Sequence, residues 1–361
     1  MKATADLLAL GQSLWLDNIT RDLLNSGRLL GYINDLSVTG LTSNPTIFEQ
    51  AISDTADYDV AIQQRVKEGK SSEALFFELA MEDLKRAAAM LRPVPDATSG
   101  SDGWVSLEVS PLLADDAAAT TEAAKRLHAS ADCPNLFIKI PGTAAGLQAI
   151  EETIFSGVPV NVTLLFSREQ YVAAAAAYWR GIQRRIDAHL DPKVNSVASI
   201  FISRWDKAVM KKAPRELQNH LGLAIAQRTY AAYCDRLQSP QWKQFADAGA
   251  LTQRLLWAST GTKDPQISET WYVENLAAPN TINTMPEKTL NALATCSESF
   301  VTMAEDGGDA ETVLAEFAKA GIDIDALATQ LQMEGAESFT KSWNDLLAMI
   351  TSKGEASKHL A

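Results

Sequence analysis

The sequence is poor in cysteine and histidine and has no long apolar run, and each shortage argues against a class of protein. Its 361 residues include only 3 cysteines and 4 histidines. An odd, scattered set of cysteines does not build a disulfide framework and suits a reducing compartment. Neither residue type has the spacing of a metal site, so no metal is predicted. No run is apolar enough to span a membrane and no signal peptide is visible, so we expect a cytoplasmic protein without a membrane partner.

Basic residues and nucleotide-binding motifs are also scarce. The net charge is −13, from 45 acidic and 32 basic residues. Because nucleic-acid binding depends on clustered Lys and Arg, no nucleic-acid partner is expected. Neither a phosphate-binding Walker loop nor a Gly-x-Gly-x-x-Gly motif follows a predicted strand. The simplest expectation is therefore chemistry without a cofactor.

What the chain does have is an alternation of short β-favouring runs with helical stretches, among them 73–91, 115–129, 168–188 and 217–237. The predicted strands are 13–16, 38–41, 105–108, 136–140, 158–164, 197–202, 254–258 and 281–283. Such alternation predicts an α/β protein with a parallel sheet, and eight strands predict closure into a (β/α)8 TIM barrel. A doubly wound open sheet is the alternative, although its glycine fingerprint is missing.

No interdomain linker is visible in the sequence. We predict a single barrel domain over residues 1–361, in which residues 286–361 form additional C-terminal helices packed on the barrel. The stretch 93–103 is rich in Pro, Ser, Gly and Asp, which is typical of a surface loop.

Lys139 is the most unusual residue, because it lies within the apolar, β-favouring run 135–142. Strand side chains alternate between faces, so Phe137 and Lys139 share one face. A buried ammonium is costly unless it is paired. A lysine desolvated in this way can become a neutral amine that forms a Schiff base with a carbonyl group. The alternative is a lysine whose stem lies on apolar surface while its head reaches water.

Polar residues collect near the ends of the other predicted strands, and in a parallel barrel the active site lies at the carboxyl ends. Each has a simpler explanation: Asp17 could cap a helix, Asn44 could belong to a turn, and Ser199 could fill barrel volume. Together they supply an amine, two carboxylates and neutral hydrogen-bonding groups, as amine catalysis on a polyhydroxylated carbonyl compound requires. The set comprises Asp17, Asn44, Glu108, Lys139, Asn161, Thr163 and Ser199.

Seven segments carry a resemblance to the transaldolase family, closest to its long bacterial branch. They are Leu-Trp-Leu-Asp at 14–17, Leu-Thr-Ser-Asn-Pro-Thr-Ile-Phe at 41–48, Val-Ser-Leu-Glu-Val at 105–109, Ile-Lys-Ile-Pro at 138–141, Asn-Val-Thr-Leu-Leu-Phe-Ser at 161–167, Ser-Ile-Phe-Ile-Ser-Arg at 199–204 and Trp-Ala-Ser-Thr-Gly-Thr-Lys at 257–263. The resemblance spans residues 7–343 in matching order.

The resemblance implies a (β/α)8 barrel of the class I aldolase type and a reaction of the non-oxidative pentose phosphate pathway. A dihydroxyacetone unit passes from sedoheptulose 7-phosphate to glyceraldehyde 3-phosphate, which gives erythrose 4-phosphate and fructose 6-phosphate. The implied partners are sugar phosphates, no cofactor is implied, and relatives include monomers and homodimers.

The resemblance also implies roles for single residues. Lys139 matches the Schiff-base nucleophile, and Glu108 matches the acid that shuttles protons through a water also held by Thr163. Asp17 matches the carboxylate that takes the C4 hydroxyl proton as the C3–C4 bond breaks. The matching substrate-binding residues are Asn44, Asn161 and Ser199 for the hydroxyls and Arg204 for phosphate.

One position departs from the family pattern. Shorter members of the family have a second phosphate-binding arginine two residues after the serine of the seventh strand. In this sequence that serine is Ser259, and the position of the arginine is occupied by Gly261. We predict that Lys263 replaces this arginine and that Ser259 contacts substrate. The alternative is a solvated loop lysine at 263.

Two other functions stay open. Fructose 6-phosphate aldolase, a relative that releases dihydroxyacetone, tends to carry Gln in place of Glu108 and Tyr in place of Phe201. Phe201 therefore favours transfer, because a tyrosine hydroxyl would bring a proton donor to an enamine that must survive until the acceptor arrives. A barrel homologue without catalysis is the second alternative, since fold alone does not imply function.

Overall fold

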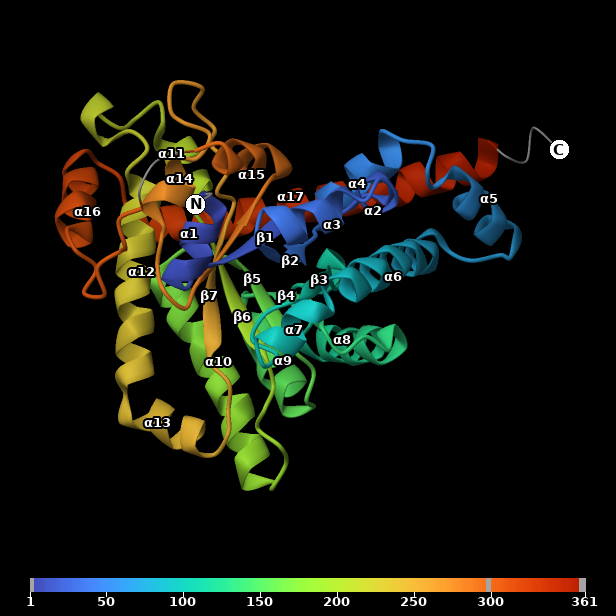
Figure 1. Cartoon of the computed structure of the whole chain (residues 1–361), viewed down its shortest axis with the longest axis horizontal. Coiled ribbons are helices and arrows are strands. Elements are labelled where there is room, and N and C mark those ends of the chain that lie inside the picture. The colour runs from blue at the N-terminus through green and yellow to red at the C-terminus, as the bar shows by residue number, and fades with distance from the viewer. Residues whose placement is uncertain (1–2, 297–299, 357–361) are drawn as a thin grey trace.

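The computed structural model describes residues 3–296 and 300–356, which form an eight-stranded parallel sheet surrounded by helices (Figure 1). The strands are β1 Ser13–Asp17, β2 Val38–Thr42, β3 Val105–Glu108, β4 Leu136–Pro141, β5 Val160–Leu165, β6 Ser196–Phe201, β7 Gln253–Ala258 and β8 Ile282–Met285. They pair in the order β2-β1-β8-β7-β6-β5-β4-β3. Backbone bonds from Gly103 N to Thr39 O (2.8 Å) and from Leu41 N to Trp104 O (2.9 Å) join the two edges. The sheet is thus a nearly closed (β/α)8 barrel, as predicted.

The helices around the barrel are α1 Ala3–Leu10, α2 Arg21–Asn25, α3 Arg28–Asp35, α4 Pro45–Ser53, α5 Asp59–Lys67, α6 Ser72–Leu91, α7 Pro93–Ala97, α8 Ala117–Ala131, α9 Ala144–Phe155, α10 Arg168–Asp187, α11 Ser203–Val209, α12 Leu221–Gln238, α13 Pro240–Asp247 and α14 Trp271–Asn275. The four helical stretches predicted by range are present as α6, α8, α10 and α12, and the structure differs from the sequence analysis at two places. The short helix α7 lies within the predicted loop 93–103, because proline is well tolerated in a first helical turn. The predicted helix 217–237 begins only at Leu221, since Arg215–Leu217 form a separate 3-10 turn.

Aromatic side chains fill the amino-terminal part of the barrel. The rings of Trp104 and Phe137 stack with centroids 4.2 Å apart, and Trp15 donates from Nε1 to Asp102 Oδ1 at 2.6 Å. Gly40 pairs with Trp15 in the β1–β2 register, and a Cβ at position 40 would come within 2.5 Å of the indole. This packing closes one end of the barrel and leaves polar side chains at the carboxyl ends of the strands.

In the part of the chain that the structure describes, three helices follow the last strand: α15 Glu287–Ala294, α16 Ala310–Lys319 and α17 Ile324–Ala356. The 33-residue helix α17 runs alongside α4 and α5 and also contacts α6 and β5 (Figure 1). Of the predicted extension 286–361, residues 297–299 and 357–361 lie outside the described residues. Within the described ranges, the helices include none with both the length and the apolar character that a membrane crossing needs.

Candidate active site

Lys139 points into the barrel and is paired there. Its Nζ donates to Ser43 O at 2.9 Å and lies 3.3 Å from Glu108 Oε2. The two residues are direct partners in the β3–β4 register, and each side chain is only 6% exposed. The head of Lys139 therefore does not reach bulk water, and a buried amine lies against a buried carboxyl group.

Two buried oxygen atoms at this pair make no hydrogen bond among the described residues: Thr163 Oγ1, and Glu108 Oε2, whose contact is the 3.3 Å ion pair with Lys139. Burial raises the pKa of Glu108; the charge of Lys139 opposes that rise and the charge of Asp17 adds to it. A carboxyl group with a raised pKa keeps its proton to a higher pH than an ordinary glutamic acid and can release it to a reacting group. Both oxygens are thus placed for proton transfer next to the amine.

Asp17 is the second carboxylate at this end of the barrel. Its Oδ1 accepts a hydrogen bond from Thr42 Oγ1 at 2.7 Å, and Thr42 Oγ1 lies 2.7 Å from Thr284 Oγ1. Burial raises the pKa of Asp17, while the positive charge of Lys139 and the Thr42 hydrogen bond act against that rise. Asp17 therefore combines a fixed orientation with an increased affinity for protons, which suits a general base.

Helix capping explains Asn44 in part but does not explain Asp17. Helix α2 begins after Thr20, whose side chain accepts from Leu23 N at 3.0 Å, so Asp17 is not its cap. Asn44 caps α4 by accepting from Ile47 N at 3.0 Å, and it also lines the cavity at the strand ends. The turn expected at 44–45 is present, and it holds Asn44 at the cavity wall.

A cavity of about 120 Å³ lies above Lys139 and brings together most of the predicted site residues. Glu108 and Asn161 are not among its lining residues. Asn161 instead donates to Ser106 Oγ at 3.2 Å and accepts from Ser199 Oγ at 2.7 Å, so it contributes to the wall behind Ser199. The predicted residues that line the cavity are Asp17, Asn44, Lys139, Thr163, Ser199, Phe201, Arg204, Ser259 and Lys263.

Two cations face this cavity, one from a helix and one from a loop. Arg204 lies in the first turn of α11, and Lys263 follows β7. Burial lowers the pKa of Lys263, and the nearby positive charges of Arg204 and Lys207 lower it further. Two like charges held at one cavity favour an anion between them, and phosphate matches the fork of an arginine side chain. Ser259 lies beside them in the left-handed region at φ +56°, a backbone strain found often at functional sites.

The residues that line the cavity and were not predicted from the sequence include Thr42, Thr284 and Phe339. Thr42 lies in the motif at 41–48, and its position next to Asn44 at a strand end could have indicated it. Phe339 has no such signal, because it reaches the barrel from α17, 200 residues after Lys139.

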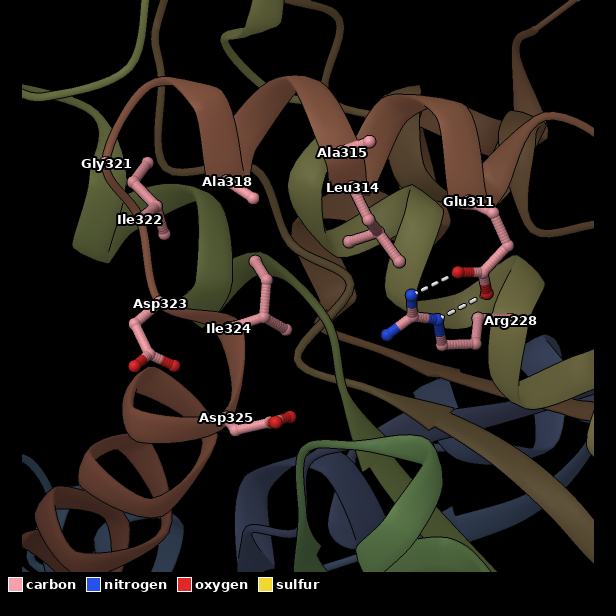
Figure 2. Close-up of a pocket in the computed structure, with 10 residues that line it drawn as sticks. All are labelled: Arg228, Glu311, Leu314, Ala315, Ala318, Gly321, Ile322, Asp323, Ile324 and Asp325. Atoms are coloured by element: carbon pink, nitrogen blue, oxygen red, sulfur yellow. Dashed lines mark hydrogen bonds and ion pairs between the residues drawn. The ribbon is translucent and has the colours of Figure 1, made fainter.

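A larger hollow of about 580 Å³ lies between α12, α16 and the start of α17 (Figure 2). Glu311 faces Arg228 across it and accepts from Arg228 Nε at 2.6 Å, and this bonding lowers the pKa of Glu311. Leu314, Ile322 and Ile324 supply apolar walls. Glu311 and Arg228 neutralise each other, and Asp323 and Asp325 add carboxylates, but the residues lining this hollow include no lysine that could act as an amine nucleophile.

The fold and the site together define a (β/α)8 barrel with a buried lysine–carboxylate pair and two cations at the carboxyl ends of its strands. The sequence model of the Transaldolase/Fructose-6-phosphate aldolase family matches residues 14–350. Proteins named transaldolase match along nearly their whole length: one from Saccharopolyspora erythraea is 41% identical (96% of both chains) and one from Thiobacillus denitrificans 40% (97% of this chain, 100% of the other). One from Neisseria meningitidis is 38% identical (97% and 100%). The chain belongs to the transaldolase/fructose-6-phosphate aldolase family.

Proposed function

We propose that this chain catalyses the transaldolase reaction, in which a Schiff base on Lys139 carries a dihydroxyacetone unit between sugar phosphates. The observation that carries the mechanism is the burial of Lys139 beside Glu108, at 3.3 Å, below a cavity that also holds Asp17 and two cations. Relatives that carry the name transaldolase are about 40% identical over nearly the full length, which supports the same activity in this chain.

Glu108 and Asp17 transfer protons at different steps of this mechanism. The amine of Lys139 attacks the C2 carbonyl of the donor, and Glu108 protonates the carbinolamine oxygen, which leaves as water. Asp17 then accepts the C4 hydroxyl proton, the C3–C4 bond breaks, and the aldehyde product departs. The electron pair of that bond stays on C3 as an enamine, which attacks the aldehyde carbon of the acceptor. Hydrolysis of the new Schiff base releases the product and restores Lys139.

Transfer is favoured over release by the residues around the enamine. Phe201 lines the cavity and packs against Phe166 at 5.3 Å between centroids, so it brings no hydroxyl proton to C3. The acid beside the amine is Glu108 and not a glutamine. Both residues differ from those typical of fructose 6-phosphate aldolase, which makes that function the second candidate.

The proposed function is tested by borohydride trapping with fructose 6-phosphate and peptide mass mapping. The expected product is a three-carbon adduct on Lys139, followed by sedoheptulose 7-phosphate formation when erythrose 4-phosphate is the acceptor. Free dihydroxyacetone as the main product would favour the aldolase function. Folded protein that gives no adduct would contradict the Schiff-base proposal.

The phosphate subsite gives a separate prediction at Lys263. We expect Lys263→Ala to raise the KM for fructose 6-phosphate about tenfold to a hundredfold, since a hydrogen bond to a charged group contributes about 1.5–3 kcal/mol. The KM for unphosphorylated fructose and the trapping at Lys139 should stay unchanged. Lys207→Ala is the control, because Lys207 is an exposed neighbouring cation that does not line the cavity. An unchanged KM for fructose 6-phosphate in the Lys263 variant would show that Lys263 is not the second phosphate ligand.

Three further features belong to this proposal. We propose that the chain acts as one catalytic domain, with the barrel and the helices after β8 working together. The monomeric or homodimeric state and the cytoplasmic location stay predictions.

A further inference from the structure

Phe339 is the one contribution of the C-terminal helices to the cavity above Lys139 among the described residues. It lies on α17, and its ring centroid is 6.0 Å from Lys139 Nζ. The side chain is nearly buried at 3% exposure, although it forms part of the cavity wall. An apolar ring therefore lies directly over the amine from outside the barrel.

Polar contacts fasten α17 on both sides of this ring. Two turns before Phe339, Gln332 Nε2 donates to Gly142 O at 3.1 Å and to Leu164 O at 2.9 Å. Three residues after it, Ser342 Oγ lies 2.8 Å from Thr46 Oγ1 at the start of α4. The ring thus has a fixed position above the ends of β4 and β5.

The backbone around Leu164 is shaped to receive α17. Leu164 has a φ of +57°, in the left-handed region that leucine rarely adopts, and the β5–β6 register shifts between Val162 and Leu165. Gly335 faces Leu164, and a Cβ at position 335 would lie 2.9 Å from Leu164 Cδ2. A larger residue there would require the Leu164 side chain or α17 to shift, so the glycine allows close packing of α17 on the barrel near Phe339.

We propose that Phe339 is a specificity-determining residue, which shields the enamine on Lys139 from water and so favours transfer over release. This inference rests on the proposed function. In release, C3 of the enamine takes a proton, water adds to C2 of the resulting iminium, and dihydroxyacetone separates from the amine. In transfer, C3 forms a bond to the acceptor carbon, whose oxygen takes the proton. A ring over a narrow cavity limits the first path by limiting the water that can donate a proton.

The test compares released dihydroxyacetone with transferred product, at saturating fructose 6-phosphate and erythrose 4-phosphate. We expect the ratio of release to transfer to rise about tenfold or more in Phe339→Ala. A tenfold rise requires only a small change in the difference between the activation free energies of release and transfer. Phe339→Leu keeps apolar bulk over the amine and should stay close to the wild-type ratio. Both variants should still give the borohydride adduct on Lys139.

Leu346→Ala is the matched control. Leu346 lies seven residues after Phe339, two turns along the same face of α17, and is fully buried away from the cavity. Because Gln332 and Ser342 still hold α17 on both sides of Phe339, this truncation should lower the melting temperature of the protein without changing the release ratio. An equal rise in Leu346→Ala, or an unchanged ratio in Phe339→Ala, would overturn the role of Phe339; if the alanine variant does not fold, the ratio in Phe339→Val decides. Failure of the proposed function is distinct, because wild-type protein would then give neither adduct nor transfer.

Discussion

Lys139→Met is expected to abolish the borohydride adduct and to reduce transfer by roughly four orders of magnitude or more, as is typical when the nucleophile of a covalent mechanism is removed. Methionine has similar length and fills the same apolar space, but it has no amine. The loss also removes the donor to Ser43 O and the positive charge beside Glu108. Because burial already raises the pKa of Glu108, this carboxyl group can take up a proton and stay neutral, so the barrel should remain folded.

Lys263→Met is the control for this experiment, since Lys263 faces the same cavity without contacting Glu108. It should keep the adduct on Lys139 while binding phosphorylated donors less tightly. Thermal melting followed by circular dichroism establishes that both variants are folded. Transfer by folded Lys139→Met at more than about a hundredth of the wild-type rate would mean that the reaction does not pass through this lysine.

The barrel and the core of its site could be predicted because both follow from local rules. Alternation of side chains along a strand put Lys139 on an interior face, and the carboxyl-end rule gathered Asp17 and Thr163 around it. The observed strands begin and end within two residues of the predicted ones. To predict the pairing of Lys139 with Glu108, the parallel register of β3 and β4 is also required. That register is expected because the two strands follow each other along the chain.

Contacts made between distant segments could not be predicted in this way. Phe339 lies on a helix whose sequence carries no strand-end or motif signal, and only the packed structure places it 6.0 Å from the lysine. Asn161 was expected at the substrate, yet its amide bonds to Ser106 and Ser199. Position in a strand fixes which face a side chain takes, whereas its hydrogen-bond partner depends on the neighbouring strands.

Asp17→Asn should leave Schiff-base formation intact and slow cleavage by about a hundredfold to ten-thousandfold, the usual contribution of a general base. An amide keeps the size of the carboxylate and can still contact Thr42, but it cannot take the C4 hydroxyl proton. Trapping with fructose 6-phosphate should therefore yield mainly an adduct that retains all six carbons, in place of the three-carbon adduct expected from wild-type protein. Mass mapping of the Lys139 peptide distinguishes the two directly.

The pH dependence of cleavage gives an independent measure of the same group. Burial raises the pKa of Asp17 above its ordinary value of 3.8, and the base works only when ionised. As the pH falls through that raised pKa, the carboxylate takes up a proton, so wild-type kcat should decline at a higher pH than an ordinary aspartate would cause. The residual activity of Asp17→Asn should lack this decline. A three-carbon adduct formed at the wild-type rate by Asp17→Asn would assign the C4 proton to another group. The same conclusion would follow if both proteins lost activity equally as the pH falls.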